Sequence, residues 1–178
     1  YNKMDVEEMI CSFLHLNSDQ KDDLHCLFHK YEKLFSGKLG LYPHRKVPIE
    51  IKQDAKPVFS QAYPVPRARE GAFKKELDHL VAIVILSIQG AAEWASPTFI
   101  IPKKDGQIRW ISDLRALNKV VKRKQYPLLL INDIMCKHKG CDFFTKLDIS
   151  MQYCTFELDD ESKELCTINT PFGMYKYN

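Results

Sequence analysis

An aspartate–glycine pair between two apolar segments is the feature that most constrains how this chain can fold. Asp105 and Gly106 separate the apolar residues 97–102 from residues 107–111, which are also largely apolar. Such a pair supplies the positive φ angles of a two-residue type I′ turn, whose twist matches that of the antiparallel strands it joins. The pattern therefore predicts a β-hairpin over residues 97–111.

Basic residues concentrate on this hairpin and just after it. The whole chain carries a formal charge of +3, yet residues 103–124 alone contain eight Lys and Arg against two Asp, a net of +6. This concentration is typical of surfaces that neutralise nucleic-acid phosphates, although most runs of charge are only solvated faces.

Lys103 and Arg109 lie on opposite arms of the predicted hairpin, so both cationic groups can serve one site. Arg suits a bidentate phosphate contact and Lys a point-charge contact. The alternative is two surface charges on an exposed hairpin. Trp110 follows Arg109, and because side chains alternate along a strand, we expect it to point to the opposite face and pack in the core.

A carboxylate at the end of an apolar strand is the strongest candidate for a metal ligand. Asp148 follows the predicted strand 143–147, where a buried charge is costly unless a cation or hydrogen-bond donors compensate it. The alternatives are a cap for the turn at Ser150 or a partner for a nearby base. The pair Asp159 and Asp160 is a weaker candidate, because its polar, acid-rich context is typical of a turn or a helix start.

Composition narrows the class of protein. With 178 residues, 45% of them hydrophobic, the chain can form one core of ordinary size. The six cysteines form no CxxC pair, and we expect free thiols in an intracellular protein without a membrane partner. The cluster Cys136–Cys141 and the pair His25 and His29 fall short of the four ligands of a structural zinc site.

Periodicity and turn signals predict an α+β fold. Before the hairpin, the sequence predicts a helix from an N-cap at Ser18 to Ser36, a strand at 47–51, an extended proline-spaced segment at 57–66, and a helix from 69 to the strand-like residues 83–86. After the hairpin, it predicts a helix at 131–138, the acid-bearing strand 143–148, and short strands at 156–158 and 165–168. A turn at 171–173 leads into a last segment. Residues 1–66 are interpreted as an N-terminal arm.

Five motifs in this order closely resemble the reverse transcriptase of gypsy-type LTR retrotransposons. They are Trp94–Gly106, Arg109–Lys119, Tyr126–Pro127, Leu147–Ile149 and Thr170–Gly173. The resemblance covers residues 43–178, and residues 1–42 resemble the connector that precedes the polymerase in such polyproteins.

The resemblance implies the fingers and the first part of the palm of a right-hand polymerase. It implies an RNA or DNA template-primer, deoxynucleoside triphosphates (dNTPs) and two divalent ions, Mg²⁺ or Mn²⁺. Asp148 matches the first metal-binding aspartate, Ile149 the residue whose backbone carbonyl adjoins the metal, and Tyr153 the aromatic gate against a ribose 2′-hydroxyl. From its position alone, Tyr153 would be a core residue.

The same resemblance assigns the polar residues of the fingers. Lys103 and Arg109 match residues that hold the incoming triphosphate. Asp113, Arg115 and Asn118 match the segment that shapes the fingers and touches the template strand.

Departures from the family pattern qualify these expectations. The proline–glycine motif and the aromatic-x-Asp-Asp hairpin do not occur in the sequence, so we expect a truncated polymerase that is inactive alone. The alternatives are a non-catalytic nucleic-acid-binding remnant and a decayed retroelement product. Val84 and Gln152 stand where the family usually has glycine. A sheet cut short leaves an exposed edge and apolar surface, so we also expect marginal stability.

Overall fold

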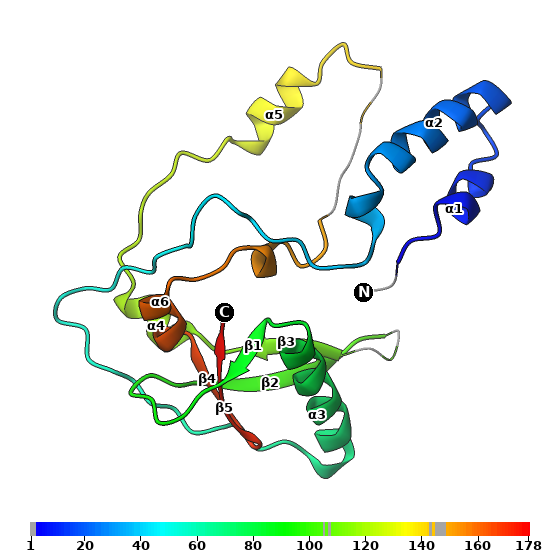
Figure 1. Cartoon of the computed structure of the whole chain (residues 1–178). Helices are drawn as coiled ribbons and strands as arrows, with labels where there is room; N and C mark the ends of the chain where they lie inside the picture. Colours follow the sequence, from blue (N-terminus) through cyan, green and yellow to red (C-terminus); the bar gives the residue numbers. More distant parts are fainter. Residues whose placement is uncertain (1–2, 105, 107, 143, 145–148) are drawn as a thin grey trace. The chain divides into compact units, whose positions relative to one another are not determined.

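The computed structural model describes residues 3–104, 106, 108–142, 144 and 149–178 (Figure 1). The chain divides into two compact units, Tyr1–Tyr42 and Pro43–Asn178. Residues 43–66, interpreted from sequence as part of an N-terminal arm, therefore belong to the second unit. Within the described ranges, no helix is both long and apolar enough to cross a membrane.

The first unit is helical. It contains α1 (Val6–Ser12), α2 (Ser18–Lys30) and the short 3-10 helix η1 (Glu32–Phe35). The N-cap of α2 is Asn17 rather than the predicted Ser18. Asn17 and Gln20 form a reciprocal capping box, in which each side chain accepts a hydrogen bond from the other residue's backbone N–H, at 2.9 and 3.1 Å.

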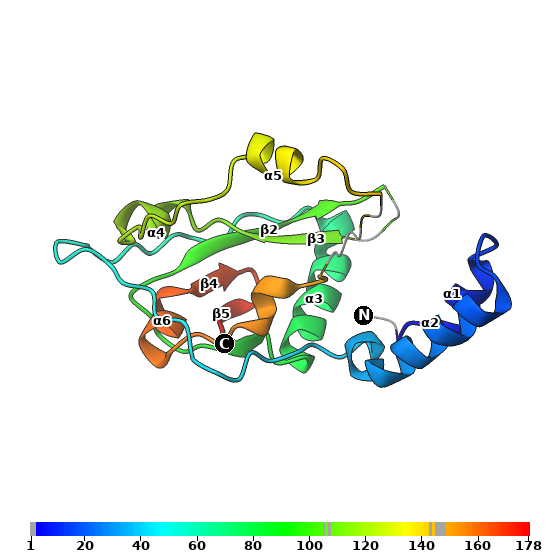
Figure 2. The same ribbon diagram turned by 90° about the horizontal axis from the view of Figure 1, so that it is seen from above.

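The second unit is a mixed α/β fold around one five-stranded sheet. Its described elements are α3 (Arg67–Ala82), β1 (Leu86–Ile88), β2 (Ser96–Pro102), β3 (Ile108–Ser112), α4 (Arg115–Val120), α5 (Ile131–Lys137), the 3-10 helix η2 (Gln152–Thr155), α6 (Asp160–Leu165), β4 (Thr167–Thr170) and β5 (Gly173–Tyr177). The strand order is β1-β5-β4-β2-β3, with β2 and β4 parallel and the other pairs antiparallel. Helix α3 lies against the sheet, in contact with β1 and β3 (Figure 2).

The main core forms where α3 meets the sheet. Phe73, Leu77 and Leu80 recur at helical spacing and are buried against a cluster that includes Ile168 and Tyr175. The sequence predicted this apolar stripe, and the structure confirms it. The structure also ends α3 at Ala82 and begins β1 at Leu86, which separates the helix from the strand that the pattern left merged.

Tyr177 on β5 connects two core clusters and reaches a distant strand. Its hydroxyl accepts a hydrogen bond from Trp110 Nε1 at 3.2 Å and lies 2.8 Å from the Ser112 hydroxyl, and both partners are on β3. Two strands separate β5 from β3 in the sheet order. The sheet must therefore curve enough for a side chain of β5 to touch β3.

The predicted hairpin is confirmed. Strands β2 and β3 pair with Pro102 opposite Ile108. Gly106 has φ +79° and donates its N–H to the Lys103 carbonyl at 3.2 Å. The two-residue turn predicted at Asp105 and Gly106 includes Asp105, which lies outside the described residues.

Helix α3 ends in a Schellman motif with valine where glycine is usual. The N–H of Ile85 donates to the Leu80 carbonyl and the N–H of Val84 to the Val81 carbonyl, both at 3.0 Å. Val84 has φ +62°, in the left-handed region that disfavours residues with a Cβ atom. The reverse transcriptases that this sequence resembles usually have glycine at this position. The left-handed backbone conformation explains that preference, because glycine adopts it without steric cost.

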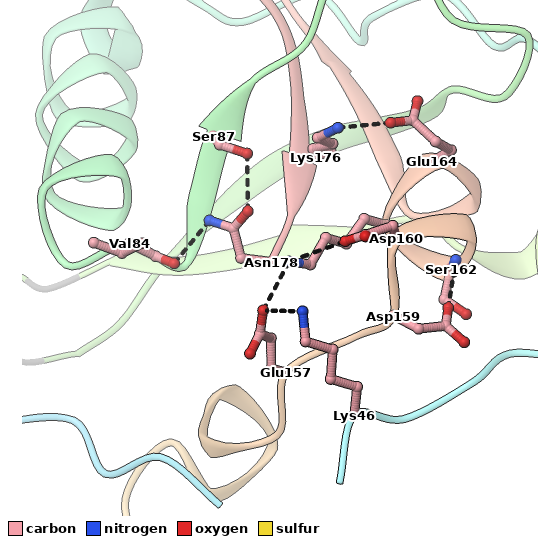
Figure 3. Close-up of polar contacts among 11 residues, drawn as sticks. Lys46, Val84, Ser87, Glu157, Asp159, Asp160, Ser162, Glu164, Lys176 and Asn178 are labelled. Atoms are coloured by element: carbon pink, nitrogen blue, oxygen red, sulfur yellow. Dashed lines mark hydrogen bonds and ion pairs between the residues drawn. The ribbon is translucent and has the colours of Figure 1, made fainter. Parts of the chain in front are cut away.

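Two predicted strands are wrong. Segments 47–51 and 156–158 form only isolated bridges, Val47 to Leu158 and Ile51 to Val121. Segment 47–51 therefore contributes two separate bridges and segment 156–158 one, and neither forms a ladder. Figure 3 shows the Lys46–Glu157 ion pair, at 3.0 Å, that accompanies the first bridge.

The segment after these bridges contains helix α6 (Asp160–Leu165), and strand β4 begins later than the sequence predicted. Asp159 is the N-cap of α6 and accepts a hydrogen bond from the Ser162 N–H at 2.8 Å, so of the two alternatives that the sequence left open, a turn and a helix start, the structure shows the helix start (Figure 3). Helix α6 extends to Leu165, so the strand predicted at 165–168 begins only at Thr167. Most of the predicted strand 143–148 lies outside the described residues.

Candidate nucleic-acid interface

The hairpin presents Arg109 on its exposed face. Arg109 is exposed on β3, whereas its neighbours Ile108 and Trp110 are half-buried. The register places Arg109 opposite Ile101, so these two side chains share a face. Lys103 directly follows the end of β2 and is also exposed.

Trp110 lies on the other face, as the alternation predicted. Its ring packs against Phe73 of α3 with centroids 4.8 Å apart. The indole nitrogen donates to the Tyr177 hydroxyl, which satisfies its only polar group. The strand bearing Arg109 is therefore held from below by both packing and a hydrogen bond.

Asp113 is the centre of a polar cluster just after β3. Its Oδ1 accepts hydrogen bonds from the Arg115 backbone N–H at 3.2 Å and from Arg115 Nε at 2.8 Å. Its Oδ2 accepts from Arg115 Nη2 at 2.6 Å and from the Tyr63 hydroxyl at 3.0 Å. The backbone N–H of Asp113 donates to the Pro97 carbonyl on β2, at 2.8 Å.

These contacts shift the pKa values of both ionised partners. The hydrogen bonds from Arg115 hold the pKa of the Asp113 carboxyl well below its usual range, with the Tyr63 hydroxyl adding to the effect and partial burial opposing it. The hydrogen bonds to the Asp113 carboxylate, together with its negative charge, raise the pKa of the Arg115 guanidinium above its ordinary value. Only 12% of the Asp113 side chain is exposed, against 83% for Arg115, so the pair is anchored at the carboxylate and open at the guanidinium.

Tyr63 is the member of this cluster that sequence reasoning missed. It lies in the extended segment before α3, and its ring makes an edge contact with Phe99 of β2, with centroids 5.9 Å apart and planes at 73°. The nearby Pro64 and Pro66 predicted an extended backbone but gave no sign of a partner. No local signal could find this contact, because Asp113 lies 50 residues further along the chain.

Arg115 and Asn118 share the exposed side of α4. They are three residues apart, which places them on one face of a helix, and both are exposed. Leu117 of the same helix is buried in a second core cluster with Trp94 and Cys166. Burial of Leu117 therefore fixes which side of α4 faces outward.

The residues around the expected metal site are only partly described. Asp148 lies outside the described residues, and Ile149 is exposed. Tyr153 on η2 is 91% exposed, so the expectation from its position alone, that it is a core residue, is wrong. Cys154 of the same turn packs against the main core cluster and leaves Tyr153 on the outer side.

The turn before Tyr153 contains a left-handed residue, but it is not Gln152. Met151 has φ +51° and precedes η2, which begins at Gln152. The left-handed conformation thus falls one residue before the position where the family usually has glycine. In the described ranges, no three His, Cys, Asp or Glu side chains come together as a metal-binding group.

Comparison with known sequences finds similarity to parts of much longer proteins. No protein-family model matches the chain. It is 33% identical over 154 residues to the uncharacterized protein K02A2.6 of Caenorhabditis elegans, an alignment that covers 85% of this chain and 12% of that protein. It is 30% identical over 129 residues to the transposon Tf2-3 polyprotein of Schizosaccharomyces pombe, covering 72% of this chain and 10% of the polyprotein. The chain therefore spans about a tenth of the length of these relatives.

Comparison with solved structures finds the same fold in foamy virus enzymes. A crystal structure of a prototype foamy virus protease–reverse transcriptase mutant superimposes with a TM-score of 0.79 at 23% identity, over 97% of this chain and 23% of that one. A foamy viral protease–reverse transcriptase in complex with double-stranded DNA gives 0.78 at 17% identity, over 100% of this chain and 38% of that one. A complex of the viral enzyme with an RNA/DNA hybrid gives 0.77 at 18% identity, over 99% and 24%. The chain is thus similar in sequence to part of a transposon polyprotein, and its fold resembles a region of foamy virus protease–reverse transcriptase.

Proposed function

We propose that residues 43–178 are the fingers and the first part of the palm of a gypsy-type RNA-directed DNA polymerase, and that residues 1–42 are the connector before it. The observation that carries this proposal is the exposure of Arg109 on β3 and of Lys103 directly after β2, on the two arms of one hairpin. In this proposal both side chains hold the triphosphate of an incoming dNTP. Arg can chelate phosphate oxygens with two N–H groups, and Lys adds a compact charge.

The template strand is assigned to the neighbouring surface. Arg115 and Asn118 on α4 contact its backbone, and Asp113 orients Arg115. The net charge of +6 over residues 103–124 supports a phosphate-binding role. Further support comes from the fold relatives solved with double-stranded DNA and with an RNA/DNA hybrid.

For the divalent metal ions, we propose individual ligands and not a complete site. Asp148 and the backbone carbonyl of Ile149 would contribute ligands for a divalent ion, and Tyr153 would stand beside the sugar of the dNTP. Two-metal nucleotidyl transfer needs several converging carboxylates, whereas the described part of the chain gathers no three metal-ligating side chains. We therefore assign nucleotide and template binding to residues 43–178, and no complete reaction.

Salt-dependent binding to a labelled RNA/DNA hybrid, followed by fluorescence anisotropy, tests the proposal. We expect log Kd to rise steeply with log salt, because each neutralised phosphate contributes a slope of about 0.9. The double variant Lys103→Ala/Arg109→Ala, measured with saturating dNTP and without it, is expected to lose the dNTP-dependent gain in hybrid affinity and to show a shallower salt slope.

The matched control is Lys38→Ala/Arg45→Ala, which removes one Lys and one Arg charge from exposed positions outside the basic segment 103–124. We expect this control to retain the binding of the native chain. Equal losses in the two double variants, or weak binding by the native chain with no salt dependence, would contradict the proposed function.

A further inference from the structure

We propose that Tyr63 is a positioning residue for the nucleic-acid contact of Arg115, and that it acts through the Asp113 carboxylate. This inference rests on the proposed function, because it assumes that Arg115 meets a phosphate of the template strand. It adds a residue from the segment before α3, which neither the sequence pattern nor the family motifs singled out.

The Asp113 carboxylate has its accepting sites fully engaged by this cluster. Oδ1 receives two hydrogen bonds from Arg115, and Oδ2 receives one from Arg115 and one from Tyr63. A carboxylate offers about four such sites, so all of them are used. Of the two hydrogen bonds to Oδ2, one comes from Arg115 and the other from the Tyr63 hydroxyl. Because Tyr63 is not part of the ion pair, its hydrogen bond holds the plane of the carboxylate independently of Arg115.

Tyr63 is suited to this role because its own segment is held firmly. The backbone of Ser60 donates to the Ala95 carbonyl at 2.9 Å, and the Ala95 N–H donates to the Val58 carbonyl at 3.0 Å. Asn169 on β4 donates its side-chain Nδ2 to the Ser60 carbonyl at 3.2 Å. The Tyr63 hydroxyl therefore reaches Asp113 from a segment anchored to the sheet, with its ring against Phe99.

The pair determines what Arg115 can offer a ligand. A guanidinium has five N–H groups, and the Asp113 carboxylate takes the one on Nε and one on Nη2. The rest of the group belongs to a side chain that is 83% exposed, so it can donate outward. Since the Asp113 charge offsets the Arg115 charge, the contribution of Arg115 depends on the direction of its donors more than on net charge, and direction is what Tyr63 fixes.

A double-mutant cycle on binding to the labelled RNA/DNA hybrid tests this inference. Tyr63→Phe keeps the ring against Phe99 and removes only the hydroxyl. We expect it to weaken binding by about three- to tenfold, and Arg115→Ala by about tenfold or more. In the Arg115→Ala background, Tyr63→Phe should cause no further loss, because the residue it positions is gone.

Tyr31→Phe is the matched control, since Tyr31 belongs to the first unit, and it should leave Kd unchanged. A Tyr63→Phe variant that binds as the native chain does, or a loss that persists in the Arg115→Ala background, overturns the inference alone. A general loss of folding would also persist in that background, so the cycle separates positioning from instability. Absence of salt-dependent hybrid binding by the native chain overturns the proposed function together with this inference.

Discussion

Asp113 is the residue on which the polar contacts of the candidate interface converge. Its hydrogen bonds join the end of β3, the start of α4 and the segment that carries Tyr63. Removal of its charge would leave the Arg115 guanidinium without its bidentate partner and the Tyr63 hydroxyl without its acceptor. A single carboxylate thus connects three parts of the fold, and its ionisation should be visible in stability.

Asp113→Asn is expected to destabilise the chain at neutral pH and less strongly in acid. The folded-state pKa of Asp113 is depressed, so its charge stabilises the fold above the unfolded pKa of about 3.9. This contribution decreases as the pH falls below about 5 and is lost through the folded pKa. Urea unfolding at pH 7 and at pH 3 should therefore show a smaller difference between variant and native chain at the lower pH.

Asp54→Asn provides the comparison, because Asp54 is an exposed turn residue of the same unit. It should change the free energy of unfolding by less than about 0.5 kcal/mol at either pH. If the Asp113→Asn difference were the same at both pH values, the carboxylate would not be stabilising the fold through its charge.

The sequence predicted the roles of some residues of the candidate interface but not their contacts. Asp113 and Arg115 were singled out by their resemblance to a family motif, but their bidentate contact with each other was not. Tyr63 carried no signal at all, because its partner lies 50 residues away and nothing in a local pattern connects them. Tyr153 was predicted from its position to be buried, yet the 3-10 helix that carries it turns its ring outward.

At the scale of elements, the sequence predicted correctly those helices and strands whose signals lie in neighbouring residues. The hairpin, the apolar stripe of α3 and the capped start of α6 all depend on residues close in sequence, and all three formed. The segments at 47–51 and 156–158 alternate like strands, but they form only isolated bridges, two in the first segment and one in the second. Alternation along a segment shows that one face is apolar and does not specify a partner strand.

Val84→Gly is expected to stabilise the end of α3. A residue with a Cβ atom in the left-handed conformation costs about 1–2 kcal/mol, and glycine's greater freedom in the unfolded chain offsets part of the gain. The Val84 side chain is 69% exposed, so its removal costs little packing. Urea unfolding should show a gain of about 1 kcal/mol.

Two further variants separate this effect from a general response to glycine. Val84→Ala keeps the Cβ atom, so it should leave most of the strain and give a smaller gain. Ala72→Gly lies at an exposed position in the interior of α3 and should lose about 1 kcal/mol, the usual cost of glycine in a helix interior. A loss on Val84→Gly would show that the valine is not strained.

At the scale of the whole molecule, the second unit combines a well-packed sheet with a long exposed segment. Every residue from 122 to 142 is exposed, with α5 in the middle of this segment (Figure 1). Its large apolar side chains include Tyr126, Leu128, Leu130 and Ile131. Exposed apolar side chains gathered in one segment promote association.

Leu128→Ser/Leu130→Ser is expected to raise solubility without changing stability. Both side chains are exposed, by 82% and 69%, so their replacement should alter the free energy of unfolding by less than about 1 kcal/mol. Light scattering at increasing protein concentration should show less association than in the native chain. By contrast, Leu77→Ser should cost several kcal/mol, because Leu77 is fully buried. A large loss of stability in the Leu128→Ser/Leu130→Ser variant would mean that the segment is packed.

The hydrogen bonds of Tyr177 make the rigidity of the basic hairpin depend on β5, because Tyr177 lies 67 residues after Trp110 along the sequence. Its phenol contacts Trp110 and Ser112, on the strand that carries Arg109. Strand β3 is thereby braced by a strand that follows it in the sequence. During synthesis, the cationic hairpin emerges well before this brace, and it becomes stiff only after β5 has formed.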